Sequence, residues 1–141
     1  MLRVVPDVNV VVSAIITPTG VPGRIYSAWK RREIYFITSA VIITKTLEVL
    51  RRPHILNAFP IDENGVRGIQ SLLEQRAILT PHALDLKVVA QDPEDDTILI
   101  AAVEGKADCI ISGDRHLKNL GSYENIPILT PTEFVTRYKI S

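Results

Sequence analysis

The sequence predicts an α/β fold in which a parallel β-sheet is covered by helices on both faces. Apolar strand-like runs alternate with helix-like patterns about five times along the chain. The expected strands are apolar at nearly every position, which is typical of strands that are buried on both faces. The chain has 141 residues, a length that fits one domain, and we expect residues 1–141 to form it.

The expected strands are short runs rich in β-branched residues and bounded by turn residues. They lie at residues 2–5, 33–39, 77–81, 107–114 and 126–130. The first ends at Pro6 and Asp7, and the fourth ends at Gly113 and Asp114. Because parallel strands open at their carboxyl ends into one crevice, Asp7 and Asp114 are expected to face the same site.

Helix spacing and end signals predict the elements between the strands. The expected helices lie at residues 9–16, 21–32, 40–52, 62–76, 95–105, 115–121 and 131–139, with a loop over 83–95. Ser39 is the expected N-cap of the third helix, and Pro53 ends it. Thr130 or Thr132 is expected near the start of the last helix.

Composition limits the function classes. Sixteen basic and sixteen acidic residues give zero net charge, so contact with a polyanion would require local basic patches. Near-zero net charge also favours self-association or a permanent partner. The lone Cys109 is expected to be a buried structural thiol. The apolar run over 8–16 is too short to span a bilayer, so a cytoplasmic location is expected.

Acidic residues precede or follow several expected elements. They are Asp7, Asp92, Glu94, Asp95, Asp96 and Asp114. Each alone could simply cap a helix. Carboxylates gathered at one edge of a sheet repel one another unless a cation is present, and their hard oxygen atoms suit Mg²⁺ or Mn²⁺. Such an ion could activate water for phosphodiester hydrolysis.

Four stretches together resemble the PIN domain family, most of all its bacterial VapC-like toxin branch. They are "VVPDVNVVVSAII", "FITSAVIITKTLEVLRRP", "DPEDDTILIAAVEGKADCIISGDRHLKNLG" and "IPILTPTEFV", which cover nearly the whole chain. The resemblance implies a three-layer α/β/α sandwich whose five parallel strands have the order 3-2-1-4-5. It also implies Mg²⁺- or Mn²⁺-dependent cleavage of RNA and, for a toxin, an antitoxin protein as partner. PIN toxins form dimers and some related proteins form tetramers, so the resemblance further implies a homodimer or tetramer.

The resemblance assigns roles to individual residues. Asp7, Asp95 and Asp114 match the metal-binding aspartates, and Asp96 is the alternative to Asp95 by one register. The matching supporting residues are Asn9, which is expected to steady Asp7, Ser39 of the "TS" motif, and Ser112, the hydroxyl of "SGD".

Two positions depart from the family pattern. Lys45 stands where the family usually carries a glutamate, and Glu48 lies one helical turn further on. Glu48 could reach back toward the metal, or the Lys45 ammonium could pair with Asp7 or Asp95 and weaken metal binding. Pro6 replaces an aliphatic residue and is expected to shorten the first strand by one residue.

Arg115, His116 and Lys118 follow Asp114 and are candidate RNA phosphate contacts. The leading hypothesis is therefore a metal-dependent endoribonuclease, the toxin of a toxin–antitoxin pair. A second hypothesis is a catalytically weakened PIN fold that binds RNA or mediates oligomerisation, which the lysine at position 45 favours. A third hypothesis is an aspartate-based phosphatase or a receiver domain. Such phosphatases need a D-x-D motif after the first strand, where this chain has D-x-N. Receiver domains need a lysine after the last strand, and this chain has none there.

Overall fold

The alternation of strands and helices follows the predicted order. The computed structural model describes residues 1–89 and 92–141. Its strands are β1 (Arg3–Pro6), β2 (Tyr35–Ser39), β3 (Ile78–Thr80), β4 (Cys109–Ile111), β5 (Ser122–Tyr123) and β6 (Ile126–Leu129). Its helices are α1 (Val8–Ile16), α2 (Val21–Lys30), α3 (Ala40–Leu50), α4 (Pro53–Ala58), α5 (Glu63–Arg76), α6 (Pro93–Glu104), α7 (Arg115–Leu120) and α8 (Pro131–Tyr138).

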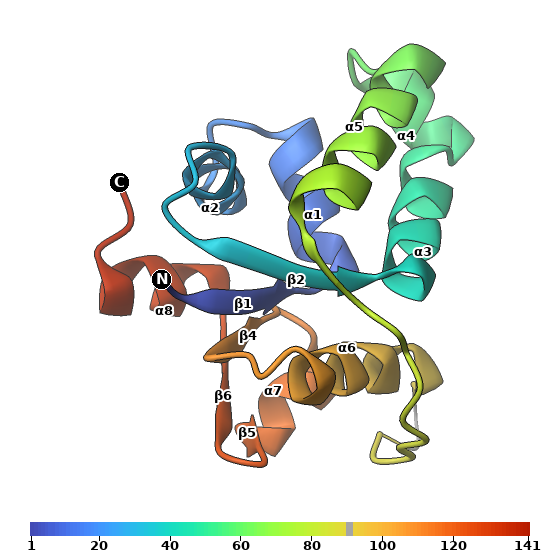
Figure 1. The fold of residues 1–141 in the computed structure, drawn as a ribbon. Coiled ribbons are helices and arrows are strands. Elements are labelled where there is room, and N and C mark those ends of the chain that lie inside the picture. Colours follow the sequence, from blue (N-terminus) through green and yellow to red (C-terminus); the bar gives the residue numbers. More distant parts are fainter. Residues whose placement is uncertain (90–91) are drawn as a thin grey trace.

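The strands form one sheet with helices on both sides, as predicted (Figure 1). Within the described residues the strand order is β3-β2-β1-β4-β6-β5. The pairs that join β3, β2, β1, β4 and β6 are all parallel, which confirms the predicted order with β6 as the fifth strand. The short β5 was not predicted, and it pairs antiparallel with β6 at the edge.

Both faces of the sheet are apolar because neighbouring residues on each strand enter opposite cores. Val4 packs with α1, α2, α3 and α5 in the larger core, whereas Val5 packs with α6 and α7 in the smaller one. Cys109 is buried in the larger core, and burial raises the pKa of its thiol to about 12, as expected for a structural thiol. Trp29 stacks on Phe36 in the same core, with ring centroids 4.6 Å apart.

Pro6 does not shorten the first strand, which is a correction to the sequence prediction. It pairs with Ile111, and the N–H of Asp7 donates to the Ile111 carbonyl at 2.9 Å. Successive residues of a strand direct their backbone groups to opposite sides, so the missing N–H of Pro6 faces β2 rather than β4. Within the described residues, the partner pairs of β1 and β2 end at Val4. Pro6 therefore has no partner residue on β2 that would need its N–H.

Several element boundaries differ from the expectation. α4 was not predicted, because Pro53 signals the end of the preceding helix. Proline is well tolerated in the first turn of a helix, and Pro53 begins α4 in this way. α6 begins at Pro93, two residues before the predicted start. The predicted loop over 83–95 has neither helix nor strand at 83–89, and its residues 90–91 lie outside the described part of the chain.

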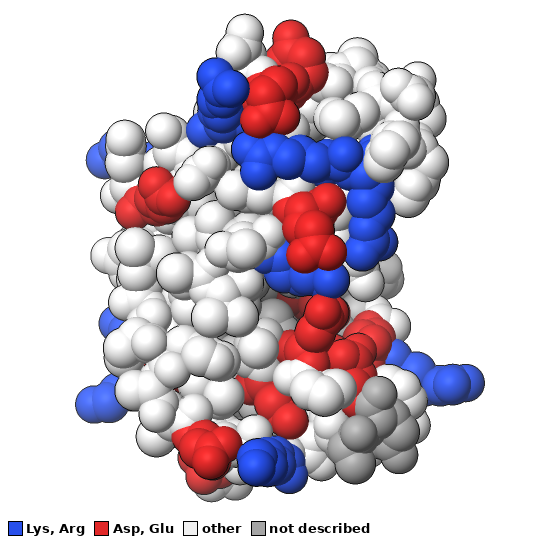
Figure 2. Space-filling model, turned by 90° about the vertical axis from the view of Figure 1, so that its right-hand side faces the viewer, with Lys and Arg blue, Asp and Glu red and all other residues white. Residues whose placement is uncertain are grey.

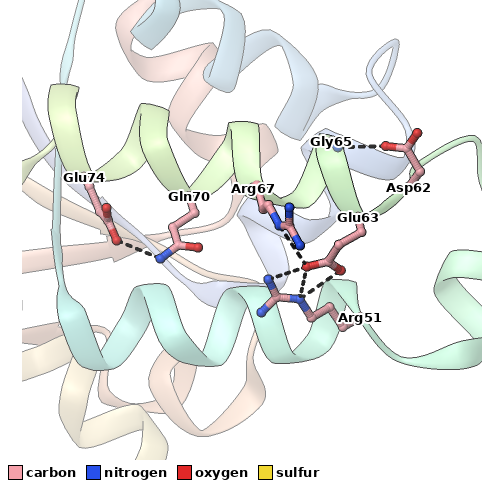
Figure 3. Close-up of polar contacts among 7 residues, drawn as sticks. All are labelled: Arg51, Asp62, Glu63, Gly65, Arg67, Gln70 and Glu74. Carbon is pink, nitrogen blue, oxygen red and sulfur yellow. Dashed lines mark hydrogen bonds and ion pairs between the residues drawn. The ribbon is translucent and has the colours of Figure 1, made fainter.

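A charged contact joins the end of α3 to the start of α5 (Figure 3). An Arg51 guanidinium nitrogen lies 2.8 Å from Glu63 Oε1, and Arg67 lies 3.7 Å from the same oxygen. Asp62 caps α5 by accepting a hydrogen bond from the Gly65 N–H at 2.8 Å. The C-terminal end of α3 is thus held against α5, on the side of the sheet that carries the larger core (Figure 1).

Among the residues that the structure describes, no single helix is long and apolar enough to cross a membrane. The adjacent helices α1 and α2 meet that criterion only as a pair, and they are bent by 94° relative to each other. Both supply buried residues to the larger core, including Val11 and Trp29.

The last helix begins with a capping box. The N–H of Glu133 donates to Thr130 Oγ1 at 3.1 Å, and Glu133 Oε1 accepts from the Thr130 N–H at 2.9 Å. The ion pair with Lys118 and these Thr130 contacts lower the pKa of Glu133 to about 2. The structure thus selects Thr130, and not Thr132, as the N-cap.

Thr130→Ala is expected to lower the free energy of unfolding by about 1 kcal/mol, because it removes a side-chain cap from α8. Thr132→Ala, two residues into the same turn, is the matched control and should change it by less than about 0.5 kcal/mol. Urea unfolding followed by Trp29 fluorescence measures both. Equal effects of the two substitutions would contradict the assignment of the cap.

Candidate metal centre

A pocket of about 390 Å³ lies at the carboxyl ends of the central strands. One side is lined by residues of α3, and the other by residues that precede or begin α6 and α7. The lining residues are Asp7, Val8, Asn9, Val41, Thr44, Lys45, Glu48, Val49, Arg52, Asp92, Glu94, Asp95, Thr97, Ile98 and Asp114. Figure 2 shows acidic side chains gathered in a hollow on this face, with Lys and Arg side chains beside them.

Asp7 reaches the pocket because it follows β1 directly. Its side chain is only 7% exposed. The Ser112 hydroxyl, which follows β4, donates to Asp7 Oδ2 at 2.7 Å. Ser112 Oγ also accepts from the backbone N–H of Asp114 at 2.9 Å. The hydroxyl donates its one proton to Asp7, and its oxygen remains free to accept from Asp114. Ser112 therefore orients the Asp7 carboxylate and positions the residue that caps α7.

Asp92, Asp95 and Asp114 bring one carboxylate oxygen each to within 4.8 Å of one another. The sequence predicted Asp95 and Asp114 for this site but not Asp92. Asp92 caps α6 through a hydrogen bond from the Glu94 N–H at 3.1 Å, and Asp114 caps α7 through the His116 N–H at 2.8 Å. Each cap uses Oδ1, so the second oxygen of each carboxylate remains for the pocket. The signal for Asp92 was the N-cap position before Pro93.

Asp95 carries the strongest sign of a missing positive charge. Its side chain is 5% exposed, and its Oδ2 is buried without a hydrogen-bond partner among the described residues. Burial, the contact with Asp114 and the charges of Asp92 and Asp7 raise the pKa of Asp95 well above its usual range. A buried acceptor without a donor is costly unless a cation or proton satisfies it.

The pKa values of the neighbouring acids shift in different directions. Burial raises the pKa of Asp7, and the Ser112 hydroxyl opposes this shift. Burial acts in the same sense on Asp114, but hydrogen bonds from the N–H groups at the start of α7, including Leu117, outweigh it and lower its pKa. Ionisation is therefore favoured most at Asp114, whereas the protonated form is favoured most at Asp95.

The donor set fits a small divalent cation. It consists of carboxylate oxygens from Asp92, Asp95 and Asp114, which are the hard ligands that Mg²⁺ and Mn²⁺ prefer. The unpartnered Asp95 Oδ2 supports the same fit. Asp7 lines this pocket too, but it lies outside the group of three, which is defined on the described residues alone.

Asp96 points away from this group. Its Oδ1 accepts hydrogen bonds from the backbone N–H groups of Val88 and Val89, at 3.0 and 2.9 Å. At the other end of α6, Glu104 accepts from the N–H groups of residues 82–84. These two carboxylates hold the segment before α6 along the helix. Of the two register alternatives, the geometry therefore places Asp95 at the site and gives Asp96 a structural contact.

Lys45 pairs with neither Asp7 nor Asp95, so one of the two alternatives given for this position was wrong. Its ammonium lies 3.0 Å from Glu94 Oε1 and 3.3 Å from Glu48 Oε1. The reason is access, because Glu48 and Glu94 are exposed at the pocket mouth, whereas Asp7 and Asp95 are buried. Glu48 lines the pocket, but it is engaged with this lysine rather than with the three-carboxylate group.

The other predicted residues lie at or near the site. Asn9 lines the pocket with an exposed side chain, and its backbone N–H helps to lower the pKa of Asp7. The side chain that donates to Asp7 is that of Ser112. Ser39 is buried and caps α3, as predicted, by accepting from the Ile42 N–H at 3.4 Å.

The predicted RNA contacts lie on α7, beyond the pocket lining. Arg115 is exposed, and His116 is partly buried. Lys118 pairs with Glu133 of α8. The structure instead adds Arg52 to the pocket lining, a residue that the sequence analysis did not place at the site.

A family model for the PIN domain matches residues 3–116, which include all the pocket residues named above. The chain belongs to the PIN domain family. PIN domains are generally nucleases and usually bind a divalent metal ion. The family assignment agrees with the parallel sheet, its strand order and the acidic pocket at its carboxyl edge.

Two further proteins are similar to this PIN domain. The uncharacterized protein MJ1680 of Methanocaldococcus jannaschii is 27% identical over 150 residues, which cover 98% of this chain and 92% of that protein. The crystal structure of FitAcB from Neisseria gonorrhoeae aligns with a TM-score of 0.48 at 12% identity, over 92% of this chain and 98% of that one.

Asp95→Asn is expected to raise the thermal midpoint of the metal-free protein at pH 8 by several degrees. The pKa of Asp95 is higher in the folded protein than in the unfolded chain. At pH values between these two pKa values, the folded protein therefore binds more protons than the unfolded chain. The contribution of Asp95 to the free energy of unfolding therefore falls as pH rises through that window, and asparagine removes the penalty.

The measurement is thermal unfolding in chelator at pH 5 and pH 8. The advantage of the variant should shrink at the lower pH, and saturating Mn²⁺ should stabilise the wild type more than the variant. A variant that is less stable than the wild type at pH 8 without metal would contradict the origin given for the pKa shift.

Proposed function

We propose that this PIN domain is a Mg²⁺- or Mn²⁺-dependent ribonuclease that hydrolyses phosphodiester bonds. The observation that carries the proposal is the convergence of Asp92, Asp95 and Asp114 within 4.8 Å, with an unpartnered buried oxygen on Asp95. Membership of a family of nucleases supports the reaction class. RNA as the substrate rests on the sequence resemblance to the VapC-like branch.

The chain would hold the ion with Asp92, Asp95 and Asp114, and Asp7 would stand beside them. The ion supplies polarisation of the phosphate and a lowered pKa of a nearby water molecule. Asp7 is suited to accept a proton from that water, because burial raises its pKa and Ser112 occupies only its Oδ2. Asp114, with its lowered pKa, keeps a permanent negative charge for the ion.

A second candidate function is an RNA-binding or oligomerisation module with weakened catalysis. The lysine at position 45 favours it, because an ammonium group on the pocket wall replaces a carboxylate that the family usually supplies. Lys45 pairs with Glu94 and Glu48, and Asp95 Oδ2 has no hydrogen-bond partner among the described residues, so Lys45 does not neutralise the acids nearest the proposed ion. This contact pattern supports the catalytic proposal over the weakened one.

The toxin role, an antitoxin partner, a homodimer or tetramer and a cytoplasmic location stay predictions. They depend on the resemblance to the toxin branch and on the near-zero net charge. The extent of residues 1–141 as one domain is likewise a prediction.

Cleavage of a mixed single-stranded RNA pool is expected with Mn²⁺ or Mg²⁺ and not with chelator. Asp95→Asn and Asp114→Asn are each expected to lower the rate by at least about a hundredfold, since each removes one charged ligand from the ion. Asp7→Asn should also lower the rate but leave the affinity for Mn²⁺ less affected than the other two. Mn²⁺ binding measured by calorimetry separates these effects.

Asp108→Asn is a matched acid-to-amide control, because Asp108 lies just before β4, at the opposite end of that strand from Ser112. It should retain wild-type cleavage. Cleavage that survives Asp95→Asn and Asp114→Asn, or that proceeds in chelator, would contradict the proposed site. A wild type that binds Mn²⁺ yet cleaves no RNA would favour the second candidate.

A further inference from the structure

The pocket has two chemically different walls. The acidic wall consists of Asp92, Asp95 and Asp114, from the starts of α6 and α7. The opposite wall is built by α3 and the residue that precedes α4, and it carries Lys45 and Arg52. These two are the cations among the described residues that line the pocket. Figure 2 shows basic side chains along one side of the acidic hollow.

Lys45 is fully charged and held by contacts that are easily exchanged. Hydrogen bonds to Glu94 and Glu48 raise its pKa. The Glu48 and Glu94 side chains are 60% and 62% exposed, and ion pairs of such exposed groups contribute little to stability. The Lys45–Glu94 pair crosses the pocket mouth from α3 to α6. An incoming polyanion could therefore replace one carboxylate at the ammonium group with little loss of folding free energy.

We propose that Lys45 is a substrate-binding residue that contacts an RNA phosphate opposite the acidic wall, with Arg52 contacting the adjacent backbone. The proposal rests on the ribonuclease function given above and adds the role of this one position. A lysine ammonium is a compact point charge that binds phosphate well. The lysine that replaces the family's glutamate then serves substrate binding, while Asp92, Asp95 and Asp114 serve the ion.

Glu94 has a defined part in this arrangement. It holds the Lys45 ammonium at the pocket mouth when no RNA is bound, and it gives the ammonium up when a phosphate arrives. Glu94→Gln should therefore tighten RNA binding when Lys45 is present, by more than the general gain from removing one negative charge. That excess should vanish when Lys45 is replaced, which a double-mutant cycle measures.

The test measures binding of a fluorescent single-stranded RNA oligonucleotide of mixed sequence by anisotropy, in saturating Mn²⁺ and over a series of KCl concentrations. All proteins carry Asp7→Asn to suppress cleavage. Lys45→Met is expected to weaken binding about five- to tenfold, as for the loss of one charge-assisted contact. It should also reduce the slope of log affinity against log salt by about 0.7, the value for one phosphate on a single strand.

Lys106→Met is the matched control, because Lys106 is exposed and follows α6 at the end remote from the pocket. It should leave both affinity and slope unchanged. Calorimetry with Mn²⁺ alone should give the same ion affinity for Lys45→Met as for its parent, and thermal unfolding confirms that each variant folds.

Each alternative outcome decides a separate question. Equal RNA affinity and slope for Lys45→Met and Lys106→Met, with Mn²⁺-dependent cleavage by the wild type, would overturn the role of Lys45 and leave the ribonuclease function standing. Tighter Mn²⁺ binding by Lys45→Met, together with faster cleavage when Lys45→Met is made alone and Asp7 is kept, would also overturn it and show that the lysine weakens the metal site. RNA binding that depends on Lys45, without any cleavage by the wild type, would support the contact and reject the ribonuclease function.

Discussion

Repulsion between carboxylates at the ends of the parallel strands is the constraint on which this structure depends. The sheet brings Asp7 and Asp114 to one edge, and the start of α6 adds Asp92 and Asp95. The chain relieves part of this repulsion with its own donors, namely the Ser112 hydroxyl and the free N–H groups that begin α6 and α7. What remains falls on Asp95, whose buried oxygen has no donor among the described residues. The folded chain thus leaves one buried carboxylate oxygen, on Asp95, without a compensating donor or cation among the described residues. This oxygen lies beside Asp92 and Asp114, which could bind the same cation.

The parallel order of five strands could be predicted because each strand is short, apolar on both faces and ended by a turn residue. The prediction that Pro6 shortens the first strand was wrong because the sequence does not show the register of the strands. A proline disrupts a strand only when its absent N–H faces a hydrogen-bonded neighbour, and this depends on the register. α4 was missed for a related reason, because the same proline that ends one helix can begin the next. Both errors concern local signals whose meaning is set by partners far away in the chain.

At the site, Asp7, Asp95 and Asp114 could be found from motifs because each directly follows a strand or begins a helix. The partners of Lys45 could not, because they depend on which carboxylates are exposed at the pocket mouth and which are already satisfied in the interior. Arg52 was missed because its place in the pocket depends on the turn between α3 and α4, and α4 itself was not expected. The sequence therefore predicts which charged residues lie near the site, but the three-dimensional fold is needed to predict which of them form ion pairs.

The two caps in the acidic wall have a consequence for how this protein tolerates change. Asp92 and Asp114 each use one oxygen to begin a helix and offer the other to the pocket. Asparagine and serine can perform the first task almost as well as aspartate, but they bring no charge to the second. A mutational survey read out by abundance in cells would thus find these positions permissive to small polar residues, whereas a survey read out by activity would find them closed. Positions that tolerate small polar residues in the abundance survey but not in the activity survey would identify the metal-binding residues without a structure of the bound ion.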